Sequence, residues 1–177
     1  MLKSRVPVLG FAAYSGTGKT TLLVKLIPLL KDAGIRVALI KHAHHDFDID
    51  IPGKDSYELR KVGANQVLVA SARRRALIRE MATEAEPQLE ELVSELDLKE
   101  VDLVLVEGFR HVAFPKIELH RPSLNRDLIF VDDPDVIAVA SDQAIDTSRL
   151  PLLDINQPEE IVRFIEDWIN SLAIKDL

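Results

Sequence analysis

The sequence predicts an α/β fold in which a mostly parallel sheet carries helices on both faces and a small β insertion. Apolar segments of strand length alternate along the chain with segments whose apolar residues recur every three or four positions. A glycine-rich loop at 13–20 separates the first strand from the first helix. The segment VDLVLVEGF, residues 101–109, is almost entirely apolar until it ends in an acidic residue and glycine. Strands of this kind are buried on both faces, which is typical of parallel sheets.

Length and composition narrow the class of protein. The 177 residues suit a single domain at 1–177, with candidate insertions at about 66–82 and 110–132, where the alternation is interrupted. A net charge of −7 argues against a general nucleic-acid-binding protein, which needs a basic surface. The chain has no cysteine, which excludes disulfides and thiolate metal sites. No apolar run approaches the roughly 20 residues of a membrane helix, so we expect a cytoplasmic protein without membrane association.

The first elements form a strand–loop–helix–strand unit. Residues 6–13 are apolar over the length of a strand, and residues 19–32 carry apolar side chains at helical spacing. Gly34 is a candidate C-cap for this helix, and residues 35–40 are predicted to form a second buried strand. This order predicts a parallel pair joined by a right-handed crossover.

The rest of the chain continues the alternation. Helices are predicted at 55–62, 86–98 and 158–172, and strands at 66–70, 73–81, 101–106, 136–140 and 152–155. Two further short strands, at 117–120 and 128–131, are candidates for a hairpin.

The loop AYSGTGKT matches the phosphate-binding pattern G-x-x-x-x-G-K-[ST] except at its first position. Gly16 and Gly18 permit backbone turns that leave amide groups facing an anion at the start of a helix. Lys19 provides a positive charge for the β- and γ-phosphates, and Thr20 provides a hydroxyl for Mg²⁺. A strand before the loop and a helix after it favour a nucleotide site, and with it a P-loop NTPase-like fold, over a chance glycine-rich turn.

Ala13 stands where the pattern has its first glycine. This position lies at the junction of strand and loop and contributes least to phosphate contact. Alanine is the smallest substitute and fits there if φ is negative. The mismatch is therefore no argument against nucleotide binding.

Glu107 ends the apolar strand and is followed by Gly108. In P-loop proteins a carboxylate at such a strand end helps to hold Mg²⁺, although it is usually an aspartate. The longer Glu107 side chain suits contact with the metal or with a metal-bound water. Lys19 and Glu107 are therefore the candidate catalytic residues, and Thr20 and Glu107 the candidate Mg²⁺ ligands. The alternative for Glu107 is a solvated acid at a strand end.

The segment KHAHHDFDID, residues 41–50, follows the second predicted strand. Ligands of open parallel sheets bind beyond the carboxyl ends of the strands, so this segment lies on the expected functional edge. The side chains of His42, His44, His45 and Asp46 suit a transition metal. They suit equally well an anionic substrate, or a polar surface loop without a ligand.

Two other features can be interpreted either as binding sites or as ordinary surface structure. Asp142 ends the segment AVASD at the same expected edge, where a carboxylate can accept two N–H bonds from guanine. That role favours GTP over ATP, and an ordinary strand-end turn is an equal alternative. Arg73–Arg75 either hold a phosphorylated ligand or an acidic partner, or lie on a solvated strand.

Five segments together resemble one family, molybdopterin-guanine dinucleotide biosynthesis protein B (MobB). In chain order they are AYSGTGKTTLL, LIKHAHHDFDID, GKDSYELRKVGA, LVLVEGF and IAVASD, and the resemblance covers nearly the whole chain. The phosphate loop and the acidic strand are shared by many NTPases, whereas the histidine segment and GKDSYELRKVGA are more specific. Ala13 also resembles the family's own form of the loop.

The resemblance implies a GTP-binding protein of the P-loop class, in the branch that includes signal-recognition and metallochaperone GTPases. It implies a homodimer with weak GTPase activity that acts with the nucleotidyltransferase MobA, which joins GMP to molybdopterin. Mg²⁺ and molybdopterin are the further ligands implied. The phosphates would be held by these loop residues: Ser15, Gly16, Thr17, Gly18, Lys19, Thr20 and Thr21. Glu107 would face Mg²⁺, and His42, His44 and His45 would contact the pterin or another substrate.

Three functions are open at this point. The first is a GTP-binding adaptor with slow hydrolysis in molybdenum cofactor maturation, and the absence of a recognisable arginine-finger or catalytic-glutamine motif agrees with slow turnover. The second is a metallochaperone GTPase whose His42–Asp46 segment binds a transition metal. The third is a small-molecule kinase or ATP-dependent ligase on the same fold.

Overall fold

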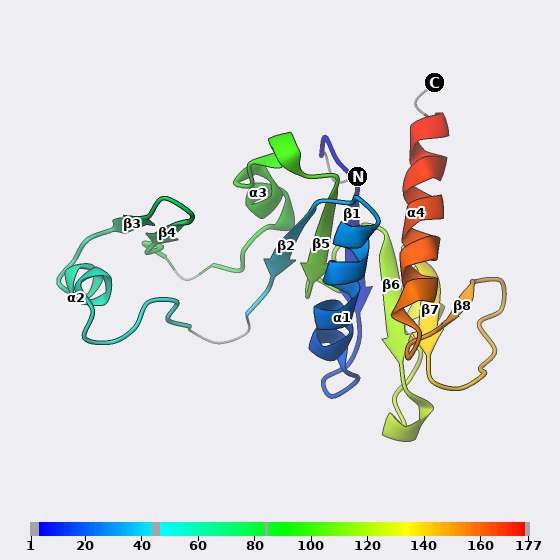
Figure 1. Ribbon diagram of the computed structural model, residues 1–177. Coiled ribbons are helices and arrows are strands. Elements are labelled where there is room, and N and C mark those ends of the chain that lie inside the picture. Colours follow the sequence, from blue (N-terminus) through cyan, green and yellow to red (C-terminus); the bar gives the residue numbers. More distant parts are fainter. Residues whose placement is uncertain (1–3, 44–46, 84, 176–177) are drawn as a thin grey trace. The chain divides into compact units, whose positions relative to one another are not determined.

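The computed structural model describes residues 4–43, 47–83 and 85–175. The chain divides into two compact units. The first unit combines Met1–His42 with Gln88–Leu177, and the second is Ala43–Pro87. The first unit contains the main sheet and the phosphate loop (Figure 1).

The main sheet has six strands in the order β2-β5-β1-β6-β7-β8, and all neighbours are parallel. The predicted parallel α/β sheet is therefore confirmed. The strands are β1 (Val8–Ala12), β2 (Val37–Lys41), β5 (Leu103–Glu107), β6 (Lys116–His120), β7 (Val136–Ser141) and β8 (Leu152–Asp154). The first two strands are parallel as expected, but β5 lies between them.

Helices cover both faces of this sheet, as the sequence predicts (Figure 1). Successive residues of a strand point to opposite faces. Leu9 of β1 accordingly packs in one apolar cluster with α1 (Lys19–Asp32) and α4 (Pro158–Lys175). Val8 packs in a second cluster with α3 (Leu89–Ser94).

The second unit contains α2 (Asp55–Lys61) and an antiparallel hairpin of β3 (Gln66–Ala70) and β4 (Arg75–Arg79). The Arg60 side chain is 8% exposed and forms ion pairs with Asp48, Asp50 and Glu80. These hydrogen bonds lower the pKa of Asp50 and raise that of Arg60. Arg60 thus links the segment before α2 to the residue after β4.

The segment expected as a second buried strand is the edge strand β2, in which only Ile40 is buried. It has one neighbour, β5, so much of its surface is open to solvent. The predicted helix at 86–98 is also shorter in the structure. The α-helix covers Leu89–Ser94, and the 3-10 helix η1 (Leu98–Glu100) follows it. The Asp97 side chain accepts the N–H of Lys99 and so starts this new turn.

The expected hairpin of 117–120 and 128–131 is wrong. Strand β6 lies inside the sheet, parallel to β1 and β7. After the 3-10 helix η2 (Pro122–Leu124), the second segment forms another 3-10 helix, η3 (Ile129–Val131), in place of a strand. Glu118 of β6 is fully buried and accepts the N–H groups of Ile129 and Phe130 at 2.9 and 2.8 Å, which fixes this turn.

Gly10 explains how the connection between β5 and β6 approaches the sheet. A Cβ atom at Gly10 would lie 2.7 Å from the ring of Phe114 and 2.8 Å from Cγ of Lys116. Both side chains are buried, so neither could move aside freely. Glycine within β1 therefore allows this connection to pack on the strand that leads into the phosphate loop. In the described part of the chain, no helix is both long and apolar enough to cross a bilayer.

Candidate nucleotide-binding site

The phosphate loop joins the end of β1 to α1, as the sequence pattern predicts. Gly16 and Gly18 have φ angles of 83° and 99°, which side chains other than glycine rarely adopt. Thr17 between them is buried, and its hydroxyl donates to the carbonyl of Tyr14 at 2.8 Å. Ser15, Thr20 and Thr21 are exposed. The loop is therefore closed by its own hydrogen bond and presents small, exposed residues at the start of a 14-residue helix.

Lys19 folds back over this loop. Its Nζ donates to the carbonyl of Ala13 at 3.0 Å, which gives the first motif position a role through its backbone. Partial burial lowers the pKa of Lys19, the carboxylate of Glu107 opposes that shift, and Arg110 and Lys41 add to it. Lys19 thus lies in a partly desolvated position among charged groups from the carboxyl ends of β2 and β5 and from the connection after β5.

Glu107 lies at the carboxyl end of β5, and the register of the sheet explains its neighbours. It is opposite Phe11 of β1 on one side and Lys41 of β2 on the other. Its side chain is 13% exposed, and the distance from Glu107 Oε2 to Lys41 Nζ is 3.6 Å. This distance is longer than a direct hydrogen bond, so the carboxylate retains lone pairs for another cation.

His42 packs against the residues that follow Glu107. A Cβ atom at Gly108, where φ is 104°, would lie 2.6 Å from Cβ of His42. The rings of His42 and Phe109 are stacked, with centroids 4.6 Å apart, and Phe109 has a φ of 55°. A left-handed conformation at a bulky residue is strained, and such strain often occurs at functional sites.

The other candidate residues of the histidine segment fall into two groups. His44, His45 and Asp46 lie outside the described residues. Asp48 and Asp50 are paired with Arg60 in the second unit. Among the described residues, no group of three or more histidine or acidic side chains is placed to hold a metal ion. Arg73–Arg75 lie at and beside the turn of the β3–β4 hairpin and are exposed.

Asp142 lies just after β7 and is paired with an arginine that no sequence pattern indicated. Arg121, just after β6, donates from Nη1 to Asp142 Oδ2 at 2.5 Å and from Nε to the carbonyl of Thr17 at 3.0 Å. Arg121 therefore connects the end of β7 to the phosphate loop. The other carboxylate oxygen, Asp142 Oδ1, is buried without a hydrogen-bond partner.

Two more arginines near the loop were also not predicted from the sequence. The guanidinium groups of Arg110 and Arg126 each lie over the ring of Tyr14, within the loop. Neither arginine belongs to a recognisable motif. Only their positions in the chain could have pointed to this site. Arg110 comes three residues after Glu107, and Arg126 follows β6.

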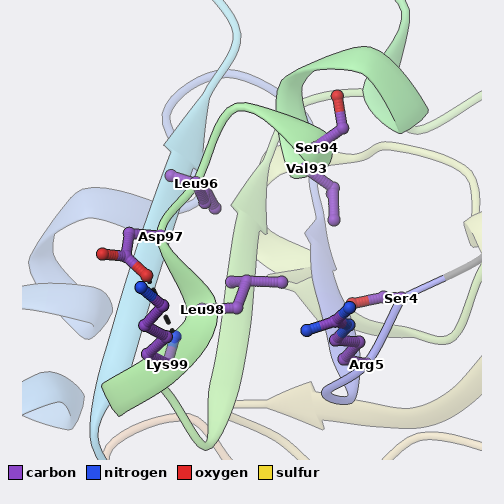
Figure 2. A pocket seen from close by; sticks show the side chains of 8 residues that line it. All are labelled: Ser4, Arg5, Val93, Ser94, Leu96, Asp97, Leu98 and Lys99. Atoms are coloured by element: carbon purple, nitrogen blue, oxygen red, sulfur yellow. Dashed lines mark hydrogen bonds between the residues drawn. The ribbon is translucent and has the colours of Figure 1, made fainter.

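One cavity lies away from this edge of the sheet. It measures about 360 Å³ and is formed by the N-terminal segment, α3 and η1 (Figure 2). Its lining residues are Ser4, Arg5, Val93, Ser94, Leu96, Asp97, Leu98 and Lys99. Ser4 and Arg5 precede β1, so the cavity is at the amino edge of the sheet, opposite the phosphate loop. A second cavity, of about 450 Å³, is lined by Tyr14 and Arg110 and therefore adjoins the loop.

Comparison with known proteins identifies the family. Residues 8–142 match the model of the family described as “Molybdopterin guanine dinucleotide synthesis protein B” (MobB). The chain belongs to the MobB family. This confirms the resemblance carried by the phosphate loop, the histidine segment and the GKDSYELRKVGA helix.

Two relatives named as adapter proteins match over almost their whole length. The molybdopterin-guanine dinucleotide biosynthesis adapter protein of Escherichia coli (strain K12) is 52% identical over 170 residues, which are 96% of this chain and 97% of the relative. The adapter protein of Haemophilus influenzae is 43% identical over 169 residues, covering 96% and 93%. A crystal structure of molybdopterin-guanine biosynthesis protein B (mobB) superposes with a TM-score of 0.70 at 26% identity, covering 91% of this chain and 99% of that one.

Proposed function

We propose that this protein binds GTP with Mg²⁺ and serves as an adapter in molybdopterin-guanine dinucleotide biosynthesis. The observation that carries the proposal is the closed phosphate loop with Lys19 folded over it and Glu107 nearby. Membership of the MobB family and the names of the two adapter relatives support the pathway.

Each loop residue has a defined task in this proposal. Backbone amides of the loop and of the start of α1 would face the phosphate oxygens, because unpaired N–H groups at a helix start favour anions. Lys19 would exchange its bond to the Ala13 carbonyl for the β- and γ-phosphates. That exchange requires little further desolvation, since the lysine is already partly buried and aimed along the loop.

The Mg²⁺ ion fits the available donors. Hard oxygen ligands are those that Mg²⁺ prefers, and the Thr20 hydroxyl and the Glu107 carboxylate are of this kind. Glu107 has no direct hydrogen bond to Lys41 at 3.6 Å, so it can accept the ion or a metal-bound water. When bound, the ion would neutralise charge on the phosphates. We expect GTP hydrolysis to be slow and secondary to the adapter role.

We assign the guanine preference to Asp142. One of its oxygens is held by Arg121, and the other, Oδ1, is buried without a partner. A buried unpaired acceptor is costly, and N–H donors of a bound guanine would remove that cost. Adenine presents a different pattern on this edge, with one amino group and no ring N–H beside it.

We also propose that the protein acts as a homodimer, through the second unit. The hairpin pairs Leu68 with Leu77 directly across its strands, and they are 63% and 53% exposed. Val62 and Met81 of the same unit are 82% and 76% exposed. Large apolar side chains that are exposed together on one small unit are typical of an interaction site. A separate partner of the protein in the pathway would be the guanylyltransferase that joins GMP to molybdopterin.

Calorimetric titration tests the nucleotide assignment. The protein is titrated with GTP and ATP, each with and without Mg²⁺, and separately with molybdopterin. We expect GTP to bind more tightly than ATP, and Mg²⁺ to strengthen GTP binding. Equal affinity for both nucleotides would exclude the guanine assignment and favour a kinase or ligase. Stoichiometric binding of Ni²⁺ or Zn²⁺, lost in a variant with alanine at His42, His44 and His45, would favour a metallochaperone.

A further inference from the structure

Arg110 lies in a sharp turn at the carboxyl end of β5. Gly108 and Phe109 before it have φ angles of 104° and 55°, and the N–H of Val112 donates to the carbonyl of Phe109 at 2.9 Å. Two successive residues with positive φ bend the chain, and the hydrogen bond closes the turn. Such a conformation at a phenylalanine persists only where the surrounding contacts hold it. The turn places Arg110 beside the phosphate loop, three residues after Glu107.

The ring of Tyr14, within the phosphate loop, orients the guanidinium group of Arg110. Cζ of Arg110 lies 5.3 Å from the ring centroid, which is within the range of cation–π interactions. This contact fixes the group without using its N–H donors, and Nε donates to Nε2 of His111 at 3.1 Å. In the described part of the chain, Nη1 and Nη2 of Arg110 have neither a hydrogen bond nor a carboxylate partner. Both terminal nitrogens are therefore available to a ligand.

Arg110 also lies close to Lys19, the cation of the phosphate loop. Burial lowers the pKa of Lys19, the charge of Glu107 opposes this shift, and the positive charge of Arg110 adds to it. Two cations so close to each other repel until an anion lies beside them. Because the lysine of a phosphate loop contacts the β- and γ-phosphates, the anion expected at this point is the terminal phosphate of a nucleotide.

The other two arginines near the loop do not meet these conditions. Arg121 already donates to a loop carbonyl and to a carboxylate. Cζ of Arg126 lies 5.7 Å from the centroid of the Tyr14 ring, but its charge is not among those of the described residues that act on Lys19. Arg110 is therefore the arginine best placed for the phosphate that Lys19 contacts.

We infer that Arg110 is a catalytic residue for GTP hydrolysis, in which its Nη1 and Nη2 groups donate to oxygens of the γ-phosphate. A planar guanidinium donates two parallel hydrogen bonds to phosphate oxygens, and these strengthen as negative charge develops in the transition state. The inference rests on the proposed function, since it requires GTP in the phosphate loop. It adds to that site a charged group that no sequence motif indicated.

The reaction defines where this charge acts. The oxygen of a water molecule forms a bond to the γ-phosphorus, and the bond from that phosphorus to the β–γ bridging oxygen breaks. The bridging oxygen keeps the electron pair and leaves with GDP, while one proton of the water stays on the inorganic phosphate and the other passes to solvent. Arg110 stabilises the charge on the transferring phosphoryl group but does not orient the water, which agrees with slow hydrolysis.

Arg110→Gln tests the assignment, and Arg126→Gln is the matched control because it removes the same charge from the same aromatic ring. Single-turnover hydrolysis of GTP is measured for each full-length chain with Mg²⁺. Calorimetry gives the affinity for GDP with and without aluminium fluoride, which together with GDP mimics the transferring phosphoryl group. Arg110→Gln should lower the rate constant at least about 100-fold and keep the Kd for GDP within about twofold. It should also lose the tighter GDP binding that aluminium fluoride gives the unmodified protein. Arg126→Gln should retain both properties.

The outcomes separate this assignment from the proposed function. If the unmodified protein binds GTP and Arg110→Gln hydrolyses it at an unchanged rate, the catalytic role is overturned and the proposed function stands. An unmodified protein that binds GTP but neither hydrolyses it nor responds to aluminium fluoride would overturn the role as well. Equal losses of rate in the two variants, or a loss of GDP affinity as large as the loss of rate, would reject it too. Absence of any binding of GTP or GDP to the unmodified protein would reject the proposed function together with this assignment.

Discussion

The imidazole ring of His42 lies stacked on the ring of Phe109, with centroids 4.6 Å apart and an interplanar angle of 20°. His42 follows the edge strand β2, and Phe109 follows β5, so the contact joins two loops at the carboxyl edge of the sheet. It becomes possible because Gly108 has no side chain and adopts a φ of 104°. The contact fixes the turn that carries Glu107.

Gly108→Ala should destabilise the protein by about 3 kcal/mol. The left-handed φ costs an alanine roughly 1–2 kcal/mol, and overpacking against His42 adds at least about 1 kcal/mol. Gly34→Ala is the matched control, because Gly34 also has a positive φ of 84° but a Cβ atom there would have nothing within 4 Å. Urea unfolding of both variants measures the difference. Equal loss of stability in the two would show that the contact with His42 costs nothing.

Lys19→Ala should weaken GTP binding by about 3 kcal/mol, or on the order of 100-fold in Kd, because it removes the charged donor to the phosphates. The fold should persist, since the Lys19 side chain donates to the loop carbonyl of Ala13 and is not part of the apolar core. Lys25→Ala, on the exposed side of α1, is the control and should bind GTP normally. Calorimetry gives both constants. Unchanged GTP affinity in Lys19→Ala would refute the site assignment.

Glu107→Gln should lower the affinity of the GTP-bound protein for Mg²⁺ by about 10- to 100-fold. GTP binding should then depend less on the presence of the ion. The amide keeps the size of the side chain but loses its charge. Affinity for GTP in the presence of EDTA should change little, which separates the metal role from phosphate binding. Glu100→Gln at the other edge of the sheet serves as the control. If Mg²⁺ strengthens GTP binding equally in variant and parent, Glu107 is a solvated acid.

Asp142→Asn should lower GTP affinity about tenfold and raise the affinity for xanthosine triphosphate. The amide can still accept from Arg121 through its oxygen, while its N–H₂ group suits the carbonyl that xanthine carries in place of the guanine amino group. Arg121→Gln should instead lower the affinity for both nucleotides to the same extent, because Arg121 donates to the Thr17 carbonyl and so anchors the loop. Competition binding with the two nucleotides distinguishes the roles. If Asp142→Asn lowers the affinity for both nucleotides equally, Asp142 only anchors Arg121 and does not recognise the base.

Leu68→Asp should convert the proposed dimer to monomer. Leu68 and Leu77 are paired on the exposed face of the hairpin, and a charge there opposes burial of that face. Gln66→Asp adds the same charge on the same face at a position that is already polar. Sedimentation equilibrium should show the dimer Kd raised on the order of 100-fold in the first variant only. A dimer in both variants would place the interface elsewhere.

The phosphate loop and most elements could be predicted from the sequence because their signals are local. The helix at Lys19–Asp32 and the strand at Gln66–Ala70 have the predicted bounds. Each depends on residues a few positions apart, whose spacing is the spacing of the element itself. The same holds for Gly16, Gly18 and Lys19, which are neighbours in both sequence and space.

The order of the strands could not be predicted, and it decides the rest of the site. The contact between Arg121 and the Thr17 carbonyl joins residues 104 positions apart, and it exists because β6 lies beside β1. Residues so far apart in the sequence leave no periodic pattern in either segment that would predict their contact. The same reason applies to Arg110 and Arg126, which meet at Tyr14 only because separate connections end at one edge of the sheet.

The sequence by itself therefore determined the position of the glycine-rich loop between β1 and α1 and the residues that form it. Only the tertiary structure decided which distant side chains meet there, such as Arg121 with Asp142 and His42 with Phe109. The physical reason is that a phosphate loop is built from backbone conformations fixed by its own glycines. Side chains that arrive from other strands are brought together by the packing of the whole sheet.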